Sequence, residues 1–272
     1  MFVPSIDINL SLAGKMDNRG GAEKEDWNSA MKKRPAGIVT GLQLEARIAR
    51  KAGSGVLVSC RGMGPKRARE AAEELVRRGA RGLVSFGFAA GLVAEAAPGM
   101  LFVPSTIRTA EGGMITTDMI WRERLLGSFR KIMEVSDAPL ASVRRPLPSY
   151  LDKASAWART QGAAADMESA AIAAVARRAG IPFVVVRAVA DPVDFNLPPA
   201  ASVAVGMDGR IRPWRLLMSL WRYPVQMRAL RELAEHARRA KSALRKAVMA
   251  AGPDFALNVD AKKPENRNTL AH

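Results

Sequence analysis

The sequence contains few of the residues on which most nucleophilic, redox and metal chemistry depends. Its 272 residues include one cysteine, Cys60, and two histidines, His236 and His272. A single cysteine cannot form an internal disulfide. Because both histidines come late in the chain, we do not expect a Ser–His–Asp triad, a Cys–His dyad in the core or a His-rich metal site. The sequence therefore predicts chemistry based on carboxylates, arginine and backbone groups, without a metal.

Long apolar runs and acidic residues are also scarce. No apolar run reaches the roughly 18 residues of a membrane span, and the N-terminal region lacks the pattern of a signal peptide. We therefore expect a cytoplasmic protein. The 26 acidic residues against 42 Lys and Arg give a net charge of +16. Such an excess favours an anionic partner, for which nucleic acid, lipid and an anionic substrate are candidates.

The length suits one α/β domain with extensions. Residues 1–34 are polar and lack a sustained periodicity, which predicts a disordered arm. Residues 35–208 alternate between short apolar strands and helical segments and form the predicted α/β domain. Residues 209–250 are rich in Lys and Arg and predict a basic amphipathic helical extension, and residues 251–272 predict a flexible tail.

Within the domain, turn and cap residues separate the expected elements. Strands are expected at 37–40, 56–59, 82–86, 98–104 and 141–143, and helices at 41–47, 66–78, 118–133 and 152–160. Residues 87–92 are mostly glycine and alanine. They predict a loop in which the backbone can approach a ligand closely.

Residues 164–192 form the most informative stretch. They predict a short strand, an alanine-rich helix that stops at Gly180, and an apolar β-branched strand with a polar end. An all-apolar strand of this kind is typical of a sheet covered on both faces. Glu168 and Asp191 lie at the ends of the two predicted strands. Open α/β sheets bind ligands at the carboxyl ends of their strands, so both residues are candidates for a binding site.

Two motifs in this stretch resemble a known family. Asp-Met-Glu-x-Ala-Ala spans residues 166–171, and Arg-x-x-x-Asp spans residues 187–191 after Pro-Phe-Val-Val-Val. Together they resemble the purine nucleoside phosphorylase and methylthioadenosine nucleosidase superfamily, and most closely its hopanoid-associated phosphorylases, over residues 36–194. The resemblance implies a mixed, twisted central sheet flanked by helices in a single domain, and a homo-oligomer. It implies no metal or organic cofactor, with phosphate as a co-substrate.

The resemblance also implies a reaction, the cleavage of a purine N-glycosidic bond with release of adenine. The hopanoid subfamily implies adenosylhopane as substrate and ribosylhopane or its 1-phosphate as product. Glu168 would bind the ribose hydroxyls, Met167 would pack on the sugar, and Asp191 would meet the purine at N7 and N6. A carboxylate can accept hydrogen bonds from both hydroxyls of a diol, and a protonated aspartate can neutralise the departing base. As structural residues, Glu168 would instead be a first-turn acid and Asp191 a turn former.

Further positions match the family's turns. Gly41 and Glu45 match its Gly-x-x-x-Glu, in which the glutamate activates water in nucleosidases, whereas phosphorolytic relatives commonly carry a phosphate-binding arginine there. The remaining substrate-binding candidates are Gly87, Phe88, Ala89 and Arg187, and the phosphate-binding candidates are Gly41 and Arg61. Phe88 replaces a usual hydroxyl residue, and Ser85 stands where some phosphorylases place an arginine for phosphate. The subfamily favours phosphorolysis, and hydrolysis of the methylthioadenosine or adenosylhomocysteine type is the alternative.

The C-terminal part offers a membrane hypothesis. Residues 212–248 interleave Trp214, Trp221 and Tyr223 with arginines, and Leu244 belongs to a possible amphipathic helix. Such a segment could bring the enzyme to an anionic membrane surface at the inner face. The alternative is a helix packed on the sheet with a solvated basic face.

A rival of another class is a basic nucleic-acid- or membrane-binding protein on an inactive nucleosidase fold. Nucleic acid is the less expected partner, because no recognised binding motif is present.

Overall fold

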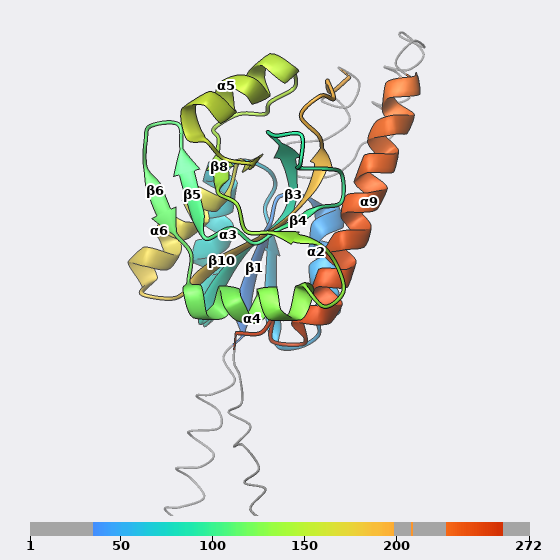
Figure 1. The fold of residues 1–272 in the computed structure, drawn as a ribbon. Helices are drawn as coiled ribbons and strands as arrows, with labels where there is room; N and C mark the ends of the chain where they lie inside the picture. The colour runs from blue at the N-terminus through green and yellow to red at the C-terminus, as the bar shows by residue number, and fades with distance from the viewer. Residues whose placement is uncertain (1–34, 199–207, 209–226, 258–272) are drawn as a thin grey trace, which may run out of the picture. The chain divides into compact units, whose positions relative to one another are not determined.

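A computed structural model describes residues 35–198, 208 and 227–257. Strand β3 (Gly82–Gly91) lies at the centre of its fold. It pairs in parallel with β1 (Ala36–Thr40) and β10 (Phe183–Asp191), and near its end it pairs antiparallel with β9 (Ala164–Asp166). The other strands of the ten-stranded sheet are β2 (Val56–Cys60), β4 (Leu101–Phe102), β5 (Thr106–Thr109), β6 (Met114–Thr116), β7 (Val135–Ser136) and β8 (Leu140–Ser142). The predicted class, a mixed sheet flanked by helices, is confirmed (Figure 1).

The helices begin and end at residues suited to those positions. They are α2 (Gln43–Ala49), α3 (Pro65–Arg77), α4 (Met119–Phe129), α5 (Tyr150–Thr160), α6 (Ser169–Ala179) and α9 (Met227–Ala251), with a short 3₁₀ turn at Arg50–Ala52. Proline opens α3, where its missing N–H costs nothing. Ser149 caps α5 and exchanges hydrogen bonds with Asp152. Gly180 ends α6 in the left-handed conformation, at φ +64°.

The two faces of the sheet are covered by different helices. Along β10, Val184 and Val186 belong to the cluster that contains residues of α2, α4 and α9, whereas Val185 and Val189 belong to the cluster built with α3 and α6. This alternation follows from the two-residue period of a strand. Every residue of β10 is buried, which confirms the predicted strand covered on both faces.

Strand β3 is longer than the sequence predicted. Residues 87–92 were expected to form a loop, but residues 87–91 continue the strand. The reason is that β10 runs on beside them: Arg187 pairs with Gly87 and Ala188 with Phe88, before the register shifts near Asp191. The short strands β5, β6 and β7 were not predicted.

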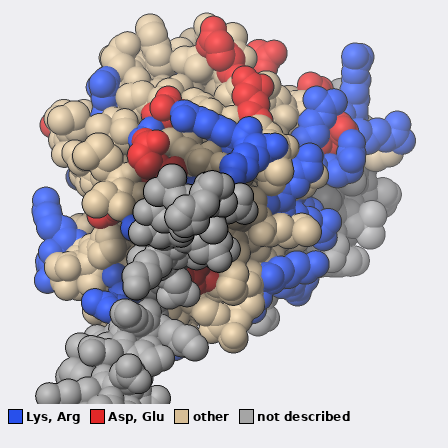
Figure 2. Space-filling view, turned by 60° about the horizontal axis from the view of Figure 1, so that its bottom comes forward, with Lys and Arg blue, Asp and Glu red and all other residues tan. Residues whose placement is uncertain are grey.

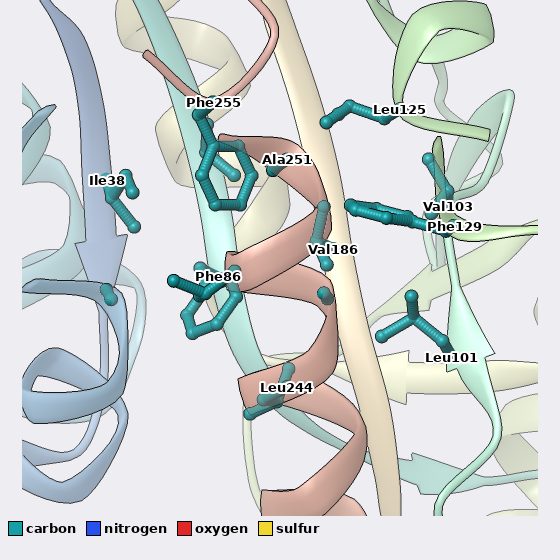
Figure 3. Packing of buried hydrophobic residues seen from close by; sticks show 14 of the residues in the cluster. Ile38, Phe86, Leu101, Val103, Leu125, Phe129, Val186, Leu244, Ala251 and Phe255 are labelled. Carbon is teal, nitrogen blue, oxygen red and sulfur yellow. The ribbon is translucent and has the colours of Figure 1, made fainter. Parts of the chain in front are cut away.

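Helix α9 confirms that the basic extension contains a helix, and it packs on the sheet. Its buried face consists of Ala240, Ala243, Leu244, Ala247, Val248 and Ala251, which contact the core around Phe86 and Val186 (Figure 3). The assignment of Leu244 to a membrane-facing surface was therefore wrong, because the sheet already covers this side chain. Trp214, Trp221 and Tyr223 lie outside the described residues.

The other face of α9 carries basic side chains. Arg238, Arg239, Arg245 and Lys246 are exposed, although Glu235 pairs with both Arg238 and Arg239. On the face shown in Figure 2, Lys and Arg gather towards one side of the molecule. Among the described residues, no helix is both long and apolar enough to cross a membrane.

The predicted start of the flexible tail, at residue 251, was placed too early in the chain. Phe255 is fully buried, and its ring meets that of Phe86 edge to face, with the ring centroids 6.0 Å apart. The indole N–H of Trp121 donates a hydrogen bond to the carbonyl oxygen of Phe255 at 2.8 Å. Phe255 therefore belongs to the core, and its ring packs beside Phe86 of β3. The predicted arm, residues 1–34, and residues 258–272 lie outside the described part of the chain.

Candidate active site

A cavity of about 250 Å³ lies at the carboxyl ends of β1, β3 and β10. It brings together most of the predicted site, namely Gly41, Glu45, Phe88, Ala89, Met167, Glu168, Arg187 and Asp191. Further walls come from apolar residues, namely Leu42, Met63, Val143, Pro146, Leu147 and Leu197. An apolar cavity with a few convergent polar groups is typical of a site for a small organic ligand.

Glu45 is held by three backbone N–H groups. Its Oε2 accepts hydrogen bonds from Gly41 at 3.0 Å and from Leu42 at 2.8 Å. Its Oε1 accepts one from Phe88 at 2.8 Å. Burial raises the pKa of Glu45 to about 7, although Arg187 and the backbone hydrogen bonds act in the opposite direction. A carboxyl with this pKa can take up and release a proton near neutral pH.

Gly87 makes room for that carboxylate. A Cβ at this position would lie 2.4 Å from Oε1 of Glu45, and the backbone φ of +155° is one that L side chains rarely adopt. Gly87 lies behind Glu45 and does not line the cavity. Its role is therefore to let β3 approach α2 closely enough for the N–H of Phe88 to reach Glu45.

Arg187 connects the two carboxylates of the first motif. Its Nη2 lies 2.7 Å from Asp166 Oδ2 and 3.3 Å from Glu168 Oε2. Its guanidinium also donates to the Ser85 hydroxyl at 2.7 Å and to the Phe88 carbonyl at 3.1 Å. A buried charge needs such partners, since an unpaired one would be strongly destabilising.

Glu168 is fixed from two directions. Its Oε1 accepts a hydrogen bond from the Gly64 N–H at 2.9 Å, and its Oε2 faces Arg187. Burial raises the pKa of Glu168, and the Arg187 charge opposes this effect. Met167, the neighbouring residue of the motif, lines the same cavity. The pair is placed as an acceptor of hydrogen bonds beside an apolar surface, which suits a sugar diol.

Asp191 lies at the end of β10, and its side chain is 12% exposed. Burial raises the pKa of Asp191 to about 6, and the nearby Lys153 ammonium acts in the opposite direction. Lys153 comes from α5 and has no exposed surface, and its Nζ lies 2.8 Å from Asp191 Oδ1. The sequence analysis did not identify Lys153, because nothing in the polar stretch around it marks it as buried.

The sequence analysis also did not identify Asp166 and Ser169 as residues of the site, and it placed Arg61 there although Arg61 lies outside the cavity. Asp166 accepts hydrogen bonds from the backbone N–H and the hydroxyl of Ser169, and the same hydroxyl lies 2.9 Å from the Ser85 Oγ. Arg61, in contrast, does not line the cavity, and its Nε pairs with Glu74 at 3.0 Å. Within the described residues, no group of His, Cys, Asp and Glu side chains could hold a metal ion.

The comparison with protein families decides the family. A model described as the phosphorylase superfamily matches residues 22–203. The chain belongs to the phosphorylase superfamily. A search of curated proteins found no match to this member. The matched region contains every side chain placed in the cavity above.

Solved structures share the fold of this superfamily member. The 5′-methylthioadenosine/S-adenosylhomocysteine nucleosidase of Neisseria meningitidis, in complex with methylthio-immucillin-A, has a TM-score of 0.60 at 17% identity, covering 79% of this chain and 96% of the other. The futalosine hydrolase of Helicobacter pylori has a TM-score of 0.58 at 14% identity, with 80% and 98% covered. The nucleosidase of Colwellia psychrerythraea, in complex with adenine, has a TM-score of 0.59 at 16% identity, with 82% and 97% covered.

Proposed function

We propose that this member of the phosphorylase superfamily hydrolyses the N-glycosidic bond of an adenine nucleoside. The observation that carries the proposal is the position of Glu45, which lines the cavity and whose carboxylate accepts hydrogen bonds from three backbone N–H groups. The neighbouring folds support the substrate class, since two of them are nucleosidases in complex with adenine or methylthio-immucillin-A.

Glu45 favours water over phosphate as the nucleophile. Backbone N–H groups at the start of a helix are a ready site for an anion. In this chain the carboxylate of Glu45 already occupies them, and its negative charge would repel phosphate. Arg61, the predicted phosphate ligand, pairs with Glu74 instead. Hydrolysis therefore replaces phosphorolysis as the preferred reaction.

The remaining side chains suit the reaction proposed. Water would attack C1′ of the ribose and lose its proton to Glu45. Glu168, oriented by Gly64 and Arg187, would accept hydrogen bonds from the ribose hydroxyls. Asp191 in its protonated form would donate to N7 of the purine as the C1′–N9 bond breaks, so that the base leaves without a full negative charge.

The apolar walls support a substrate with an apolar 5′ group. Leu42, Val143, Leu147 and Leu197 line the cavity together with the catalytic carboxyls, and apolar surface leaves water favourably when such a group binds. Adenosylhopane and methylthioadenosine both carry a group of this kind. Adenosylhopane, the homo-oligomer and the contact of residues 212–223 with an anionic membrane remain predictions.

The test is adenine release from adenosylhopane and methylthioadenosine, with and without phosphate, in water enriched in ¹⁸O. We expect adenine, a free sugar that carries ¹⁸O at C1, and a rate that does not depend on phosphate. A sugar 1-phosphate would overturn hydrolysis while keeping the glycosidic cleavage. Salt-sensitive retention of DNA without adenine release from any nucleoside would instead favour a binding protein on an inactive fold.

A further inference from the structure

Lys153 is a buried cation that the reaction described above does not use. Its side chain has no exposed surface, and its Nζ donates to three oxygens, Asp191 Oδ1 at 2.8 Å, the Pro192 carbonyl at 2.6 Å and the Phe195 carbonyl at 2.7 Å. An ammonium group has three donors, so these partners satisfy it completely. A lysine buried in this way loses hydration and side-chain freedom, which suggests that its position has a purpose.

The three partners fix the end of β10 relative to α5. The loop after β10 is tied to the start of α5 at two further places, where the Leu197 N–H donates to the Pro148 carbonyl and the Tyr150 N–H donates to the Asn196 side chain, both at 2.8 Å. Lys153 is thus inserted between a helix and a loop that are already held together. Its ammonium group cannot move away from Asp191 without breaking hydrogen bonds to the loop.

The contact divides the two oxygens of Asp191. Oδ1 faces the ammonium group, whereas the described residues give Oδ2 no hydrogen-bond partner, and Asp191 lines the cavity. A carboxyl arranged in this way presents a single oxygen to a ligand. This arrangement suits a donor that must point at one ring nitrogen.

We propose that Lys153 is a positioning residue for Asp191. Lys153 directs Asp191 Oδ2 towards the purine, and it stabilises the carboxylate that remains when the proton has passed to N7. The inference rests on the proposed function. The proton moves from Asp191 Oδ2 to N7, the electrons of the C1′–N9 bond stay with the purine, and Asp191 becomes an anion. Lys153 keeps its own proton throughout.

Two opposing influences act on Asp191. Burial favours its protonated form, and the Lys153 charge favours the carboxylate, which together place its pKa at about 6. Burial without the ammonium would keep the proton but make Asp191 a weaker donor. The other ionisable side chains of the cavity are Glu45 from α2, Asp166 from β9, Glu168 before α6 and Arg187 from β10, while His236 of α9 contacts the ring of Phe195. None of them hydrogen-bonds to Asp191 in the described part of the chain.

The experiment compares Lys153→Met and Lys153→Gln with the wild type. Methionine removes the charge and the donors, and glutamine retains an amide donor without the charge. At pH 5, where Asp191 holds its proton in every variant, we expect kcat to fall about 10-fold or more in Lys153→Met, and less in Lys153→Gln, with little change in KM. We also expect the pH optimum of kcat/KM to move upwards by about half a unit or more in both variants, because the pKa of Asp191 rises.

Controls separate this role from a structural one. Lys131→Met and Lys131→Gln change an exposed lysine and should leave the profile unchanged. In an Asp191→Asn background, Lys153→Met should have little further effect on kcat, because Lys153 acts through Asp191. An unchanged pH optimum in both folded Lys153 variants, or additive losses in the double variant, would overturn the proposal.

Two further measurements keep the outcomes distinct. If the Lys153 variants do not fold, the carboxyl ¹³C signal of Asp191 is titrated in the wild type, with Asp191→Asn as the assignment. A midpoint near pH 6 that moves when adenine binds supports the proposal, and a signal that does not respond between pH 4 and 8 overturns it. If the wild type releases no adenine, the proposed function fails, whereas normal release with unaffected Lys153 variants refutes the positioning role alone.

Discussion

The Gly64 N–H donates a hydrogen bond to the Glu168 carboxylate at 2.9 Å, across 104 residues of sequence. The turn before α3 thereby orients a side chain that stands just before α6. The other oxygen of the same carboxylate faces Arg187 at 3.3 Å. The two contacts leave little freedom for the side chain that we assign to the ribose, so binding does not have to order it.

The substitution Glu168→Gln should weaken the site without removing its shape. The amide oxygen can still accept from Gly64, but the charge opposite Arg187 is lost, and the amide NH₂ can no longer accept hydrogen bonds from a hydroxyl. Since hydrogen bonds to charged groups contribute about 1.5–3 kcal/mol, we expect kcat/KM for adenine release to fall roughly 10- to 100-fold. Glu74→Gln, on α3 and outside the cavity, is the control. Wild-type kinetics in a folded Glu168→Gln variant would refute the ribose assignment.

The pH dependence of kcat/KM should be a bell. The proposed reaction requires Glu45 as the anion, with a pKa of about 7, and Asp191 in its protonated form, with a pKa of about 6. Activity is lost at low pH because Glu45 takes up a proton, and at high pH because Asp191 gives up its proton. The optimum should therefore lie midway, near pH 6.5. A rate that rises steadily to pH 9 would contradict the role of Asp191 as an acid.

Glu45 should also make stability depend on pH. Its pKa rises from 4.5 to about 7 on folding, so the folded state binds more protons than the unfolded state between these values. Stability should consequently fall as pH rises from about 4.5 to 7 and then level off with respect to this group. In Glu45→Gln this decline should be smaller, because only Asp191 and Glu168, whose pKa values burial also raises, still contribute to it; thermal unfolding of both proteins across the window would reveal the difference. Parallel curves for the two proteins would argue that the pKa of Glu45 is not raised.

Gly87→Ala tests the close approach of β3 to Glu45. The added Cβ would meet Oε1 of Glu45 at 2.4 Å, so the carboxylate must move out of its three N–H donors. We expect loss of about 10²-fold or more in turnover. Gly127→Ala in α4 is the matched control, since its Cβ would meet nothing within 4 Å and alanine favours a helix. Equal activity in the two variants would show that the position of the Glu45 carboxylate does not matter for the reaction.

Phe255→Ala tests the packing of residues 252–257 in the core. The ring is fully buried beside Phe86, and removal of a buried phenylalanine side chain costs about 3–5 kcal/mol in the free energy of unfolding. Urea unfolding should show this loss. Met249→Ala is the control in the preceding helix, because Met249 is 82% exposed, and its effect should stay within about 0.5 kcal/mol. A similarly small effect of Phe255→Ala would show that the ring does not support the fold.

The sequence predicted the parts of this protein that local patterns specify. Asp191 ends a strand with a clear apolar pattern, Glu168 comes just after a short strand, and Glu45 follows a recognisable turn, so their convergence could be expected. The continuation of β3 beyond Phe86 could not, because its extended form depends on pairing with β10, which comes about a hundred residues later. Lys153 and Arg61 show the same limit: burial of the lysine and the pairing of the arginine with Glu74 are set by tertiary contacts.

The packing of α9 has a consequence for the order in which the protein can mature. The residues that form the cavity all precede residue 198, whereas the apolar side of Phe86 and Val186 is covered by Leu244, Ala251 and Phe255. During synthesis, the first part of the chain can pair its strands and add α2 and α4, while the part of this side that α9 and Phe255 cover still faces water. An emerging chain would then carry an adhesive apolar surface. A nascent chain halted before residue 240 should accordingly depend on chaperones, even though the carboxyls proposed to act in the reaction have all been made.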